Sequence, residues 1–305
     1  AGASVPRIGR ELAKKGLIRD PLFFRLYAYL NGFYNLQPGN YKIDPGEELK
    51  EILSKLKKGE RNIKSINIPP GWTIIEIANR LSVSGINREK FIAAVKKREQ
   101  KPVYAFEKMI PHNPGRTFLL EGYLAPGCYE LTGHEHPEEI VEKMLQAFNN
   151  MLTKLNLPED RMLDELLTIA SLVEREGDLP EERPLIASVI DNRLRQSNYL
   201  KRLQVDATLI YMMTVKQGHK YRGNNLHKVR EISHPYNTYL RNGLPPGPIA
   251  NVSLESFQAA LCPAISADLF YVNKSNKSRE HFFARTFEEH KRNIKLSEKN
   301  SKHEE

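Results

Sequence analysis

The chain of 305 residues has the composition of an ordinary globular protein, with 40% hydrophobic and 27% charged residues and a formal net charge of +9. This length is enough for two domains. No apolar run approaches the roughly 20 residues of a membrane-spanning helix, and Arg10 and Glu11 interrupt any signal-peptide pattern early. Cys128 and Cys262 are too few for a disulfide framework, although they could pair with each other.

The basic charge is concentrated in the first part of the chain. Residues 1–116 carry 22 Lys and Arg against 11 Asp and Glu, whereas the remaining residues carry 24 against 26. Basic clusters such as Lys96-Lys97-Arg98 are short, and no nucleic-acid-binding motif accompanies them. We therefore expect no nucleic-acid partner, and instead an attraction to an anionic membrane surface or to anionic wall polymers.

Turn-and-helix units repeat along the N-terminal part. Pro45-Gly46 precedes an amphipathic stretch at 49–56, and Pro70-Gly71 precedes a similar stretch at 74–81. Residues 73–78 look like the helix start of LysM-type glycan-binding modules, and residues 39–43 alternate like a short strand. Trp72, the only tryptophan, could stack on a sugar or pack in the core. The helices predicted here are 8–15, 21–30, 49–56, 74–81 and 88–98.

The rest of the chain predicts more helices and one strand, which makes the fold class α+β. The helices are 138–155, 160–176, 180–196 and 254–261, and the strand is 269–272. We place the domain boundaries at 1–116 for the N-terminal repeats with a LysM-like module and at 117–295 for a second, helix-rich domain. Residues 296–305 are charged and lack apolar content, so we expect this tail to fray.

The helix predicted at 160–176 is apolar around most of its circumference. Gly177 and Pro180 predict that it ends at Glu176. There, burial against Leu172 and Val173 and the partial negative charge of the helix C-terminus both disfavour an ionised carboxylate. A carboxyl group kept protonated near neutral pH is a general acid, which makes Glu176 a catalytic candidate. The alternative is a structural role, in which Glu176 caps the turn or pairs with an arginine such as Arg193.

Polar blocks before and after this helix resemble a known family. They are Glu121-Gly122-Tyr123, the stretch 171–176, Asp191-Asn192-Arg193-Leu194, the stretch 203–211, Tyr236-Asn237-Thr238-Tyr239 and the Pro/Gly-rich stretch 243–249. Over residues 119–293, their order and spacing resemble those of the YceG-like endolytic murein transglycosylases. The resemblance implies a lysozyme-like transglycosylase domain that cleaves the bond between N-acetylmuramic acid and N-acetylglucosamine and leaves 1,6-anhydromuramyl ends.

In this family the catalytic glutamate maps onto Glu176. The resemblance implies that one carboxyl group acts first as acid and then as base, and that no cofactor is needed. The sequence also has no Cys/His cluster with zinc spacing and no glycine-rich phosphate loop. A true hydrolase would need a second carboxylate to handle water, and Asp206 is the nearest candidate.

Other residues of these blocks are candidates for binding the substrate or orienting Glu176. Gln204, Asp206, Asn237 and Tyr239 have suitable side chains, although Asp206 and Asn237 could equally form a helix cap or an Asx turn. Glu174 is the better candidate for a structural carboxylate, paired with Arg193. Glu121 belongs to the same candidate set, and Gly243, Leu244, Pro245 and Pro246 begin a rigid loop that we expect to wall the cleft.

Two features depart from the family or stay open. Gly127-Cys128 stands where the family usually has Asp-Thr, so any role of that pair is in doubt here. His281 and His290 resemble family positions, and we favour a structural role over a general base for both.

The resemblance also implies partners and a location. The substrate would be peptidoglycan glycan strands, and cell-wall synthesis proteins such as penicillin-binding proteins would be partners. The family has an N-terminal membrane anchor and the chain begins without methionine, so we interpret it as the extracytoplasmic part of a longer protein. The alternative from another class is a non-catalytic scaffold whose LysM-like part binds glycan.

Overall fold

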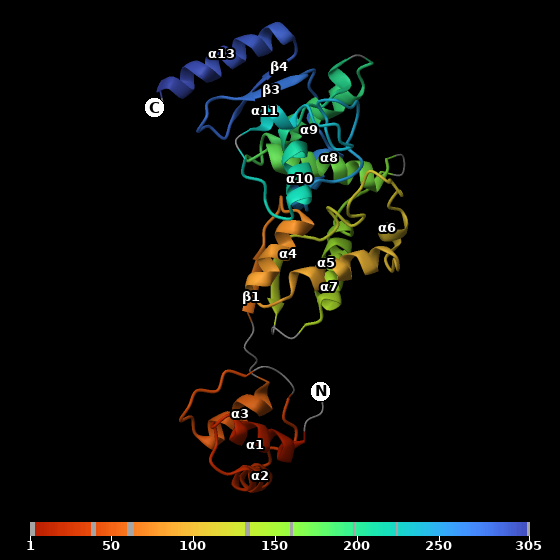
Figure 1. Cartoon of the computed structure of the whole chain (residues 1–305). Helices are drawn as coiled ribbons and strands as arrows, with labels where there is room; N and C mark the ends of the chain where they lie inside the picture. The colour runs from red at the N-terminus through yellow and green to blue at the C-terminus, as the bar shows by residue number, and fades with distance from the viewer. Residues whose placement is uncertain are drawn as a thin grey trace. The chain divides into compact units, whose positions relative to one another are not determined.

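The computed structural model describes residues 4–37, 41–59, 64–131, 135–158, 161–197, 199–223 and 225–303. They form two compact units (Figure 1). One comprises Ala1–Ile66 with Tyr129–Glu135, and the other comprises Asn67–Cys128 with His136–Glu305. The helices at 74–99, which we placed in the N-terminal domain, lie in the same compact unit as the helix that carries Glu176.

Three helices build the first unit: α1 (Val5–Lys14), α2 (Pro21–Leu30) and α3 (Leu49–Lys58). Asp20 caps α2, since its carboxylate accepts a hydrogen bond from Leu22 N at 2.7 Å. Phe24, Ile52 and Leu53 are fully buried between these helices. All three helices confirm predictions from hydrophobic spacing.

The strand predicted at 39–43 is not formed over residues 41–43, the part of it that the structure describes. Residues 39 and 40 lie outside the described residues, and 41–43 run as an irregular segment. The Tyr41 hydroxyl donates to the carbonyl oxygen of Gln37 at 2.6 Å, so this aromatic residue packs locally. Alternating apolar and polar side chains are not enough to form a β-strand, because a strand also needs a partner strand to pair with.

The described residues contain two small sheets. In one, β1 (Lys64–Ile68) pairs with β2 (Gly127–Leu131). The other is an antiparallel hairpin of β3 (Phe270–Asn273) and β4 (His281–Ala284), with Tyr271 opposite Phe283. The strand predicted at 269–272 is confirmed as β3, whereas β1, β2 and β4 were not predicted.

Helices make up most of the second unit. After β1 come α4 (Ile74–Val83), α5 (Arg88–Glu99) and α6 (Ala105–Lys108), and after β2 comes α7 (Pro137–Leu152). Next follow α8 (Leu163–Glu176), α9 (Arg183–Leu194), a 3₁₀ turn (Tyr199–Lys201), α10 (Asp206–Gln217), α11 (Leu226–Val229) and α12 (Leu254–Leu261). The spacing of apolar residues predicted α4, α5, α7, α8, α9 and α12 to within a few residues.

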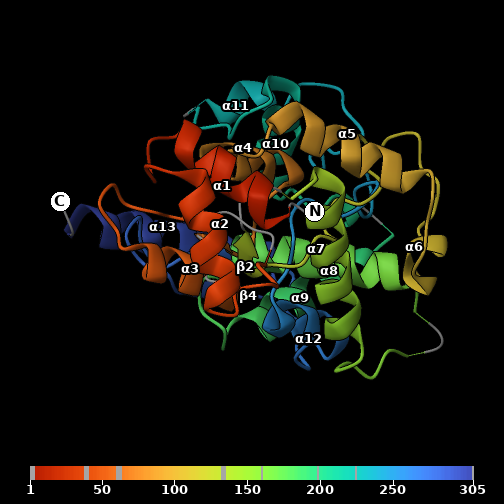
Figure 2. The same cartoon turned by 90° about the horizontal axis from the view of Figure 1, so that it is seen from below.

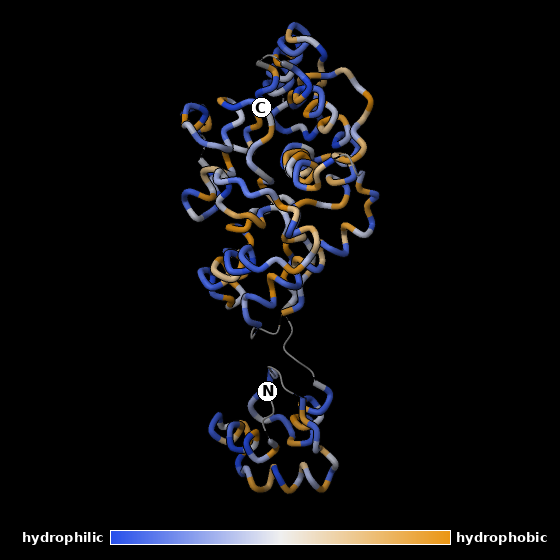
Figure 3. The backbone as a smooth tube through the Cα atoms, turned by 90° about the vertical axis from the view of Figure 1, so that its right-hand side faces the viewer, coloured by the Kyte–Doolittle hydropathy of each residue, from blue (hydrophilic) through white to orange (hydrophobic). Residues whose placement is uncertain are grey.

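Helix α8 is the core of this unit. It packs against α9 and α12, and Figure 2 shows the three side by side. Leu166, Leu172 and Val173 are completely buried, and so is the polar residue Ser171. In Figure 3, apolar and polar stretches alternate along most helices of the chain, as expected for helices that bury one face. On α8 the polar residues Asp164, Thr168 and Ser171 are buried as well, so most of the helix surface is covered by the rest of the unit.

The tail predicted to fray is helical as far as His303, and residues 304 and 305 lie outside the described residues. Helix α13 runs from Phe287 to His303. Ser301 is buried and its hydroxyl accepts a hydrogen bond from Asn276 N at 2.9 Å, while Asn300 Nδ2 donates to Lys274 O at 2.8 Å. The β3–β4 connection thus gives this polar segment partners that its own composition did not reveal. None of the helices in the described part of the chain is long and apolar enough to cross a membrane.

Candidate active site

The end of α8 fixes the position of Glu176. The helix stops there as predicted, and Gly177 N still donates to Val173 O at 2.8 Å. Gly177 has an extended rather than a left-handed backbone. A Cβ atom at this glycine would lie 3.0 Å from Arg183 and 3.1 Å from Ile186. The glycine is therefore explained by the close approach of α9 rather than by a left-handed helix cap.

Glu176 is half-buried, and its surroundings favour the protonated form. Burial is the main cause that raises the pKa of Glu176, and the negative charge of Asp206 raises it further. A hydrogen bond from the Tyr271 hydroxyl to Glu176 Oε2, 3.1 Å long, opposes this rise, as do the charges of His281 and Arg175. The raised pKa predicted from the sequence is confirmed in direction.

The β3–β4 hairpin supplies the hydroxyl group that contacts Glu176. Tyr271 lies on β3, and burial raises the pKa of Tyr271 well above its usual value, so it remains a donor. Against the Tyr271 ring lies His281 of β4, edge-on with ring centroids 5.4 Å apart. The imidazole Nδ1 of His281 lies 2.7 Å from Glu182 Oε2, and its backbone N donates to Glu182 Oε1 at 3.0 Å. His281 is thus tied to a carboxylate, as expected for a structural histidine.

A second polar cluster consists of Asp206, Tyr239 and Arg230. The Tyr239 hydroxyl donates to Asp206 Oδ1 at 2.6 Å, and Arg230 bonds both carboxylate oxygens at 3.1 and 3.2 Å. Arg230 also stacks over the Tyr239 ring at 4.6 Å. Asp206 is close enough to Glu176 for its negative charge to raise the pKa of Glu176, and the charge of Glu176 in turn raises the pKa of Tyr239. The structure therefore brings these two candidates to the catalytic candidate.

Gln204 lies at the edge of this group with an unusual backbone. Its φ is 53°, the one positive value among the described non-glycine residues, and its side chain is exposed. Gln204 N donates to Thr238 O at 3.1 Å, and its Oε1 accepts from Arg193 at 3.3 Å. Arg193 also donates to Leu203 O at 2.8 Å. Strained backbone of this kind clusters at functional sites, and Gln204 is free to reach a ligand.

Glu174 has a different role from Glu176, although only Arg175 separates them. Its carboxylate accepts hydrogen bonds from Ser253 N at 2.8 Å and from the Ser253 hydroxyl at 2.5 Å. Its ion-pair partner is Arg183 at 3.4 Å, so the predicted pairing with Arg193 is wrong. Arg183 is the first residue of α9 and its guanidinium reaches back to Glu174, whereas Arg193 donates to Leu203 O. Glu174 connects α8 to the start of α12.

Asn237 and Glu121 do not lie on the site surface. Asn237 is completely buried: its Nδ2 donates to Arg230 O and Ile232 O at 2.9 and 2.8 Å, and its Oδ1 accepts from Tyr239 N at 2.9 Å. It forms the Asx turn that we considered, and it cannot contact a substrate. Glu121 is 1% exposed and accepts from Ile74 N at 2.9 Å. It caps α4, where a helix dipole favours a carboxyl oxygen.

The loop 243–249 is held at three points. Gly243 N donates to Lys201 O at 2.8 Å, Arg116 Nε donates to Pro246 O at 2.8 Å, and Ile249 N donates to the Ser171 hydroxyl at 3.1 Å. The Arg116 guanidinium crosses Gly247 so closely that no side chain fits there. These anchors confirm that the loop is a fixed part of the unit.

The sequence did not identify three residues of this site as site residues: Tyr271, Glu182 and Arg230. Tyr271 had only a strand signal, which says nothing about a carboxylate 95 positions earlier. Cys128 and Cys262 are both exposed, and no disulfide joins them. Within the described ranges, no group of His, Cys, Asp and Glu is arranged to hold a metal ion.

The chain is similar to known proteins. Residues 1–296 match the model of the YceG-like family. The chain is 32% identical to a Bacillus subtilis protein named endolytic murein transglycosylase, over 99% of the chain and 85% of that protein. It is 28% identical to a Streptococcus pneumoniae protein of the same name, of which it covers 56%.

A solved structure of a yceG-like protein is also similar to the chain. The crystal structure of a yceG-like protein from Listeria monocytogenes is similar with a TM-score of 0.65 at 30% sequence identity, and the match covers 96% of both chains. Similarity of this extent covers both units, including the N-terminal helices.

Proposed function

The chain belongs to the YceG-like family, and we propose that it is an endolytic murein transglycosylase that leaves 1,6-anhydromuramyl ends on glycan strands. The names of its relatives support a lytic transglycosylase. One observation carries the assignment of the catalytic residue: Glu176 is a half-buried carboxyl group with a raised pKa and a phenol as its hydrogen-bond donor. Such a group can deliver a proton near neutral pH.

Glu176 acts twice in the proposed reaction. It first protonates the glycosidic oxygen, so that the bond from C1 of the muramic residue breaks and an oxocarbenium-like centre forms. The Glu176 carboxylate then takes the proton from the C6 hydroxyl of the same residue while that oxygen bonds to C1. The proton given and the proton taken balance, and no water is consumed.

The neighbouring residues assist these two steps. Tyr271 donates to Glu176 Oε2, which orients the carboxyl group and stabilises its ionised form between the steps. Asp206 accepts hydrogen bonds from Arg230 and from the Tyr239 hydroxyl, and its negative charge favours both protonated Glu176 and a positive centre on the sugar. Gln204, exposed beside them, binds the sugar.

The fixed loop 243–249 forms a wall of this site and keeps water from the oxocarbenium-like centre. Its anchoring to Arg116 and Ser171 supports this role, because a wall that moved would admit water. This role explains the prolines at 245 and 246, which stiffen the loop.

The remaining parts of the proposal concern binding and location. The start of α4, whose sequence looks like the helix start of LysM-type modules, has a capping box between Thr73 and Glu76, and we assign a glycan-binding role to this region. A substrate in the peptidoglycan implies that the protein acts outside the cytoplasm. The protein is anchored to the membrane, and its partners are cell-wall synthesis proteins such as penicillin-binding proteins.

A second candidate is a hydrolase of glycan strands. It is favoured by the nearness of Asp206 to Glu176, since two carboxylates are the usual equipment of glycosidases. Against it stands the engagement of Asp206 by Arg230 and Tyr239, which leaves it poorly placed to activate water. A scaffold without activity would make no use of a raised pKa at Glu176.

Mass spectrometry of purified glycan strands after incubation with the protein separates these candidates. Anhydro ends support the transglycosylase, reducing ends support the hydrolase, and uncut strands support the scaffold. The matched Glu176→Gln variant is expected to leave the strands uncut, because an amide has the shape of the acid without its proton.

A further inference from the structure

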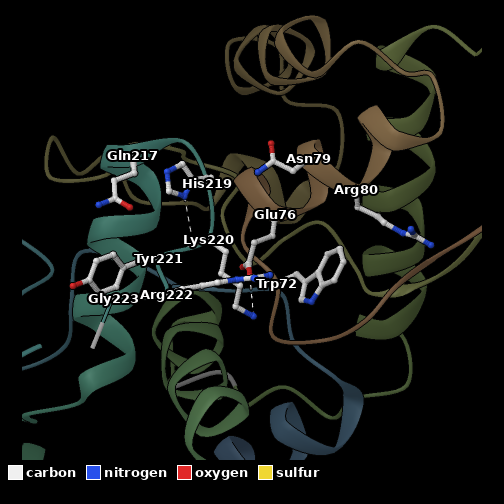
Figure 4. Close-up of a pocket in the computed structure, with 10 residues that line it drawn as sticks. All are labelled: Trp72, Glu76, Asn79, Arg80, Gln217, His219, Lys220, Tyr221, Arg222 and Gly223. Atoms are coloured by element: carbon white, nitrogen blue, oxygen red, sulfur yellow. Dashed lines mark hydrogen bonds and ion pairs between the residues drawn. The ribbon is translucent and has the colours of Figure 1, made fainter. Parts of the chain in front are cut away.

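A groove of about 820 Å³ lies beside the start of α4, and the carboxylate site does not account for it. One wall is Trp72 with the first turns of α4, and the other is the segment 217–223 that follows α10. Figure 4 shows the Trp72 and Tyr221 rings on opposite sides of the Glu76–Lys220 ion pair. Its size is that of a small-molecule or oligosaccharide site.

The groove is a built feature, because both walls are fixed to each other. Arg88 donates to Asn79 Oδ1 at 2.7 Å and to Gly218 O at 2.8 Å, which links α4 with the turn after α10. Lys220 and Glu76 form a second link at 3.4 Å. Binding of a ligand in this groove therefore loses little conformational entropy of the walls, because they are already ordered.

Trp72 is held in place by its backbone, which leaves its half-buried ring available to the groove. Its N donates to Asn251 Oδ1 at 2.8 Å, and its carbonyl oxygen accepts from Asn251 N at 2.8 Å. A fixed indole ring at the wall of an open, polar groove offers a flat apolar face, which is what the C–H face of a pyranose ring stacks on.

Cationic side chains surround this ring. Arg80 and Arg222 are exposed, and in the described part of the chain neither has a carboxylate partner. Lys220 is 48% exposed despite its ion pair with Glu76. A guanidinium group without a carboxylate partner can bind a carboxylate through two parallel hydrogen bonds, that is, as a bidentate pair. The groove therefore suits a ligand that combines sugar rings with carboxylates.

A direct link joins this groove to the carboxylate site. Arg175 donates to Gly71 O at 2.8 Å, and these two residues are the chain neighbours of Glu176 and Trp72. The Trp72 turn therefore rests on the last turn of α8. A polymer that is cut at Glu176 has an uncut continuation, and the groove is the neighbouring place with suitable chemistry to hold it.

We propose that this groove binds an uncleaved stretch of the same glycan strand, with a sugar ring on Trp72 and stem-peptide carboxylates on Arg80 and Arg222. This inference rests on the proposed function for the identity of the strand. It assigns to the groove a role in holding long substrates rather than in the chemical step.

Trp72 is the only tryptophan of the chain, so its fluorescence reports directly on this groove. The experiment titrates the Glu176→Gln variant of the full chain with purified uncleaved glycan strands that carry stem peptides. We expect a saturable change in fluorescence, and weaker binding of strands from which the peptides have been removed. Adding Arg80→Gln and Arg222→Gln should raise the Kd by about tenfold, the order of two exposed charge-assisted contacts.

The matched control adds Arg285→Gln and Arg292→Gln, which remove the same charge from exposed positions outside the groove. Its Kd should equal that of the parent. The proposal is overturned if strands leave the fluorescence unchanged, or if the groove and control variants bind alike. Because this assay measures binding alone, a fluorescence response without any cleavage by the wild type would refute the proposed function and leave the groove assignment standing.

Discussion

Two glutamates of the second unit, Glu176 and Glu121, both have a raised pKa, yet their surroundings differ. Burial raises the pKa of Glu121 to about 8, and its strongest polar contact is the Ile74 backbone N–H at the start of α4. Burial also raises the pKa of Glu176, but this residue is half-buried and receives a side-chain donor, Tyr271.

This comparison teaches that a raised pKa does not by itself identify a catalytic acid. Glu121 is 1% exposed, so no substrate can reach its proton. Glu176 combines the raised pKa with access and with polar neighbours, Asp206 and Tyr239, that have a use in the reaction. Exposure and polar partners therefore decide whether a glutamate with a raised pKa is structural or catalytic.

The largest expected effect is on activity. Glu176→Gln should lower the rate of strand cleavage by roughly a hundredfold to ten-thousandfold, the usual contribution of a positioned acid. Glu121→Gln should stay within about threefold of the wild type, because the amide imitates the protonated carboxyl that burial already favours. Product release from purified strands measures both. Equal losses in the two variants would remove the distinction drawn here.

Glu121 should govern how stability depends on pH. Its folded pKa of about 8 lies above the usual value of 4.5, so between these pH values the folded state holds a proton that the unfolded state has released. Rising pH in this window therefore lowers the free energy of unfolding, and the loss is complete above about pH 8. Thermal unfolding between pH 5 and 9 should show a falling Tm that flattens in Glu121→Gln. An unchanged slope would mean that other groups cause it.

Tyr271→Phe should sharpen the assignment of Glu176. Activity is expected to fall as pH rises through the pKa of Glu176, because the acid must be protonated. The hydrogen bond from Tyr271 lowers that pKa, so its removal should move the fall to higher pH and reduce kcat by about tenfold. A pH–rate profile provides the measurement. A lower rate with no shift would indicate that Tyr271 acts only through packing.

Glu174→Gln should affect stability more than chemistry. It removes the ion pair with Arg183 and weakens the link to Ser253, at a cost of about 1 to 3 kcal/mol in the free energy of unfolding. The folded fraction should keep most of its activity. Glu165→Gln, at an exposed position of the same helix, is the control and should unfold like the wild type. Normal stability with lost activity would instead make Glu174 the acid.

The smallest effect is expected from the loop. Replacing Pro245 and Pro246 by glycine should loosen it at a cost of up to about 1 kcal/mol per residue. If the loop excludes water, some reducing ends should then appear beside the anhydro ends, at a modestly lower rate. An unchanged ratio of ends at an unchanged rate would show that water is excluded by another part of the site.

Sequence periodicity determined where most of the longer helices lie, and Gly177 with Pro180 determined which residue ends α8. Apolar spacing is a local property, so it located α4, α8 and α12 and placed Glu176 in a desolvated position. It failed for α13, whose stabilising contacts with Lys274 and Asn276 come from a distant hairpin.

Only the tertiary structure decided which polar groups meet. Packing of the β3–β4 hairpin against the end of α8 brings Tyr271 to Glu176 across 95 positions of sequence, and the return of α9 selects Arg183 rather than Arg193 as the partner of Glu174. Likewise, Glu121 became a cap because α4 begins beside it. Hydrogen bonds and ion pairs act over a few ångströms in space, and no local pattern encodes which distant residues come within that range.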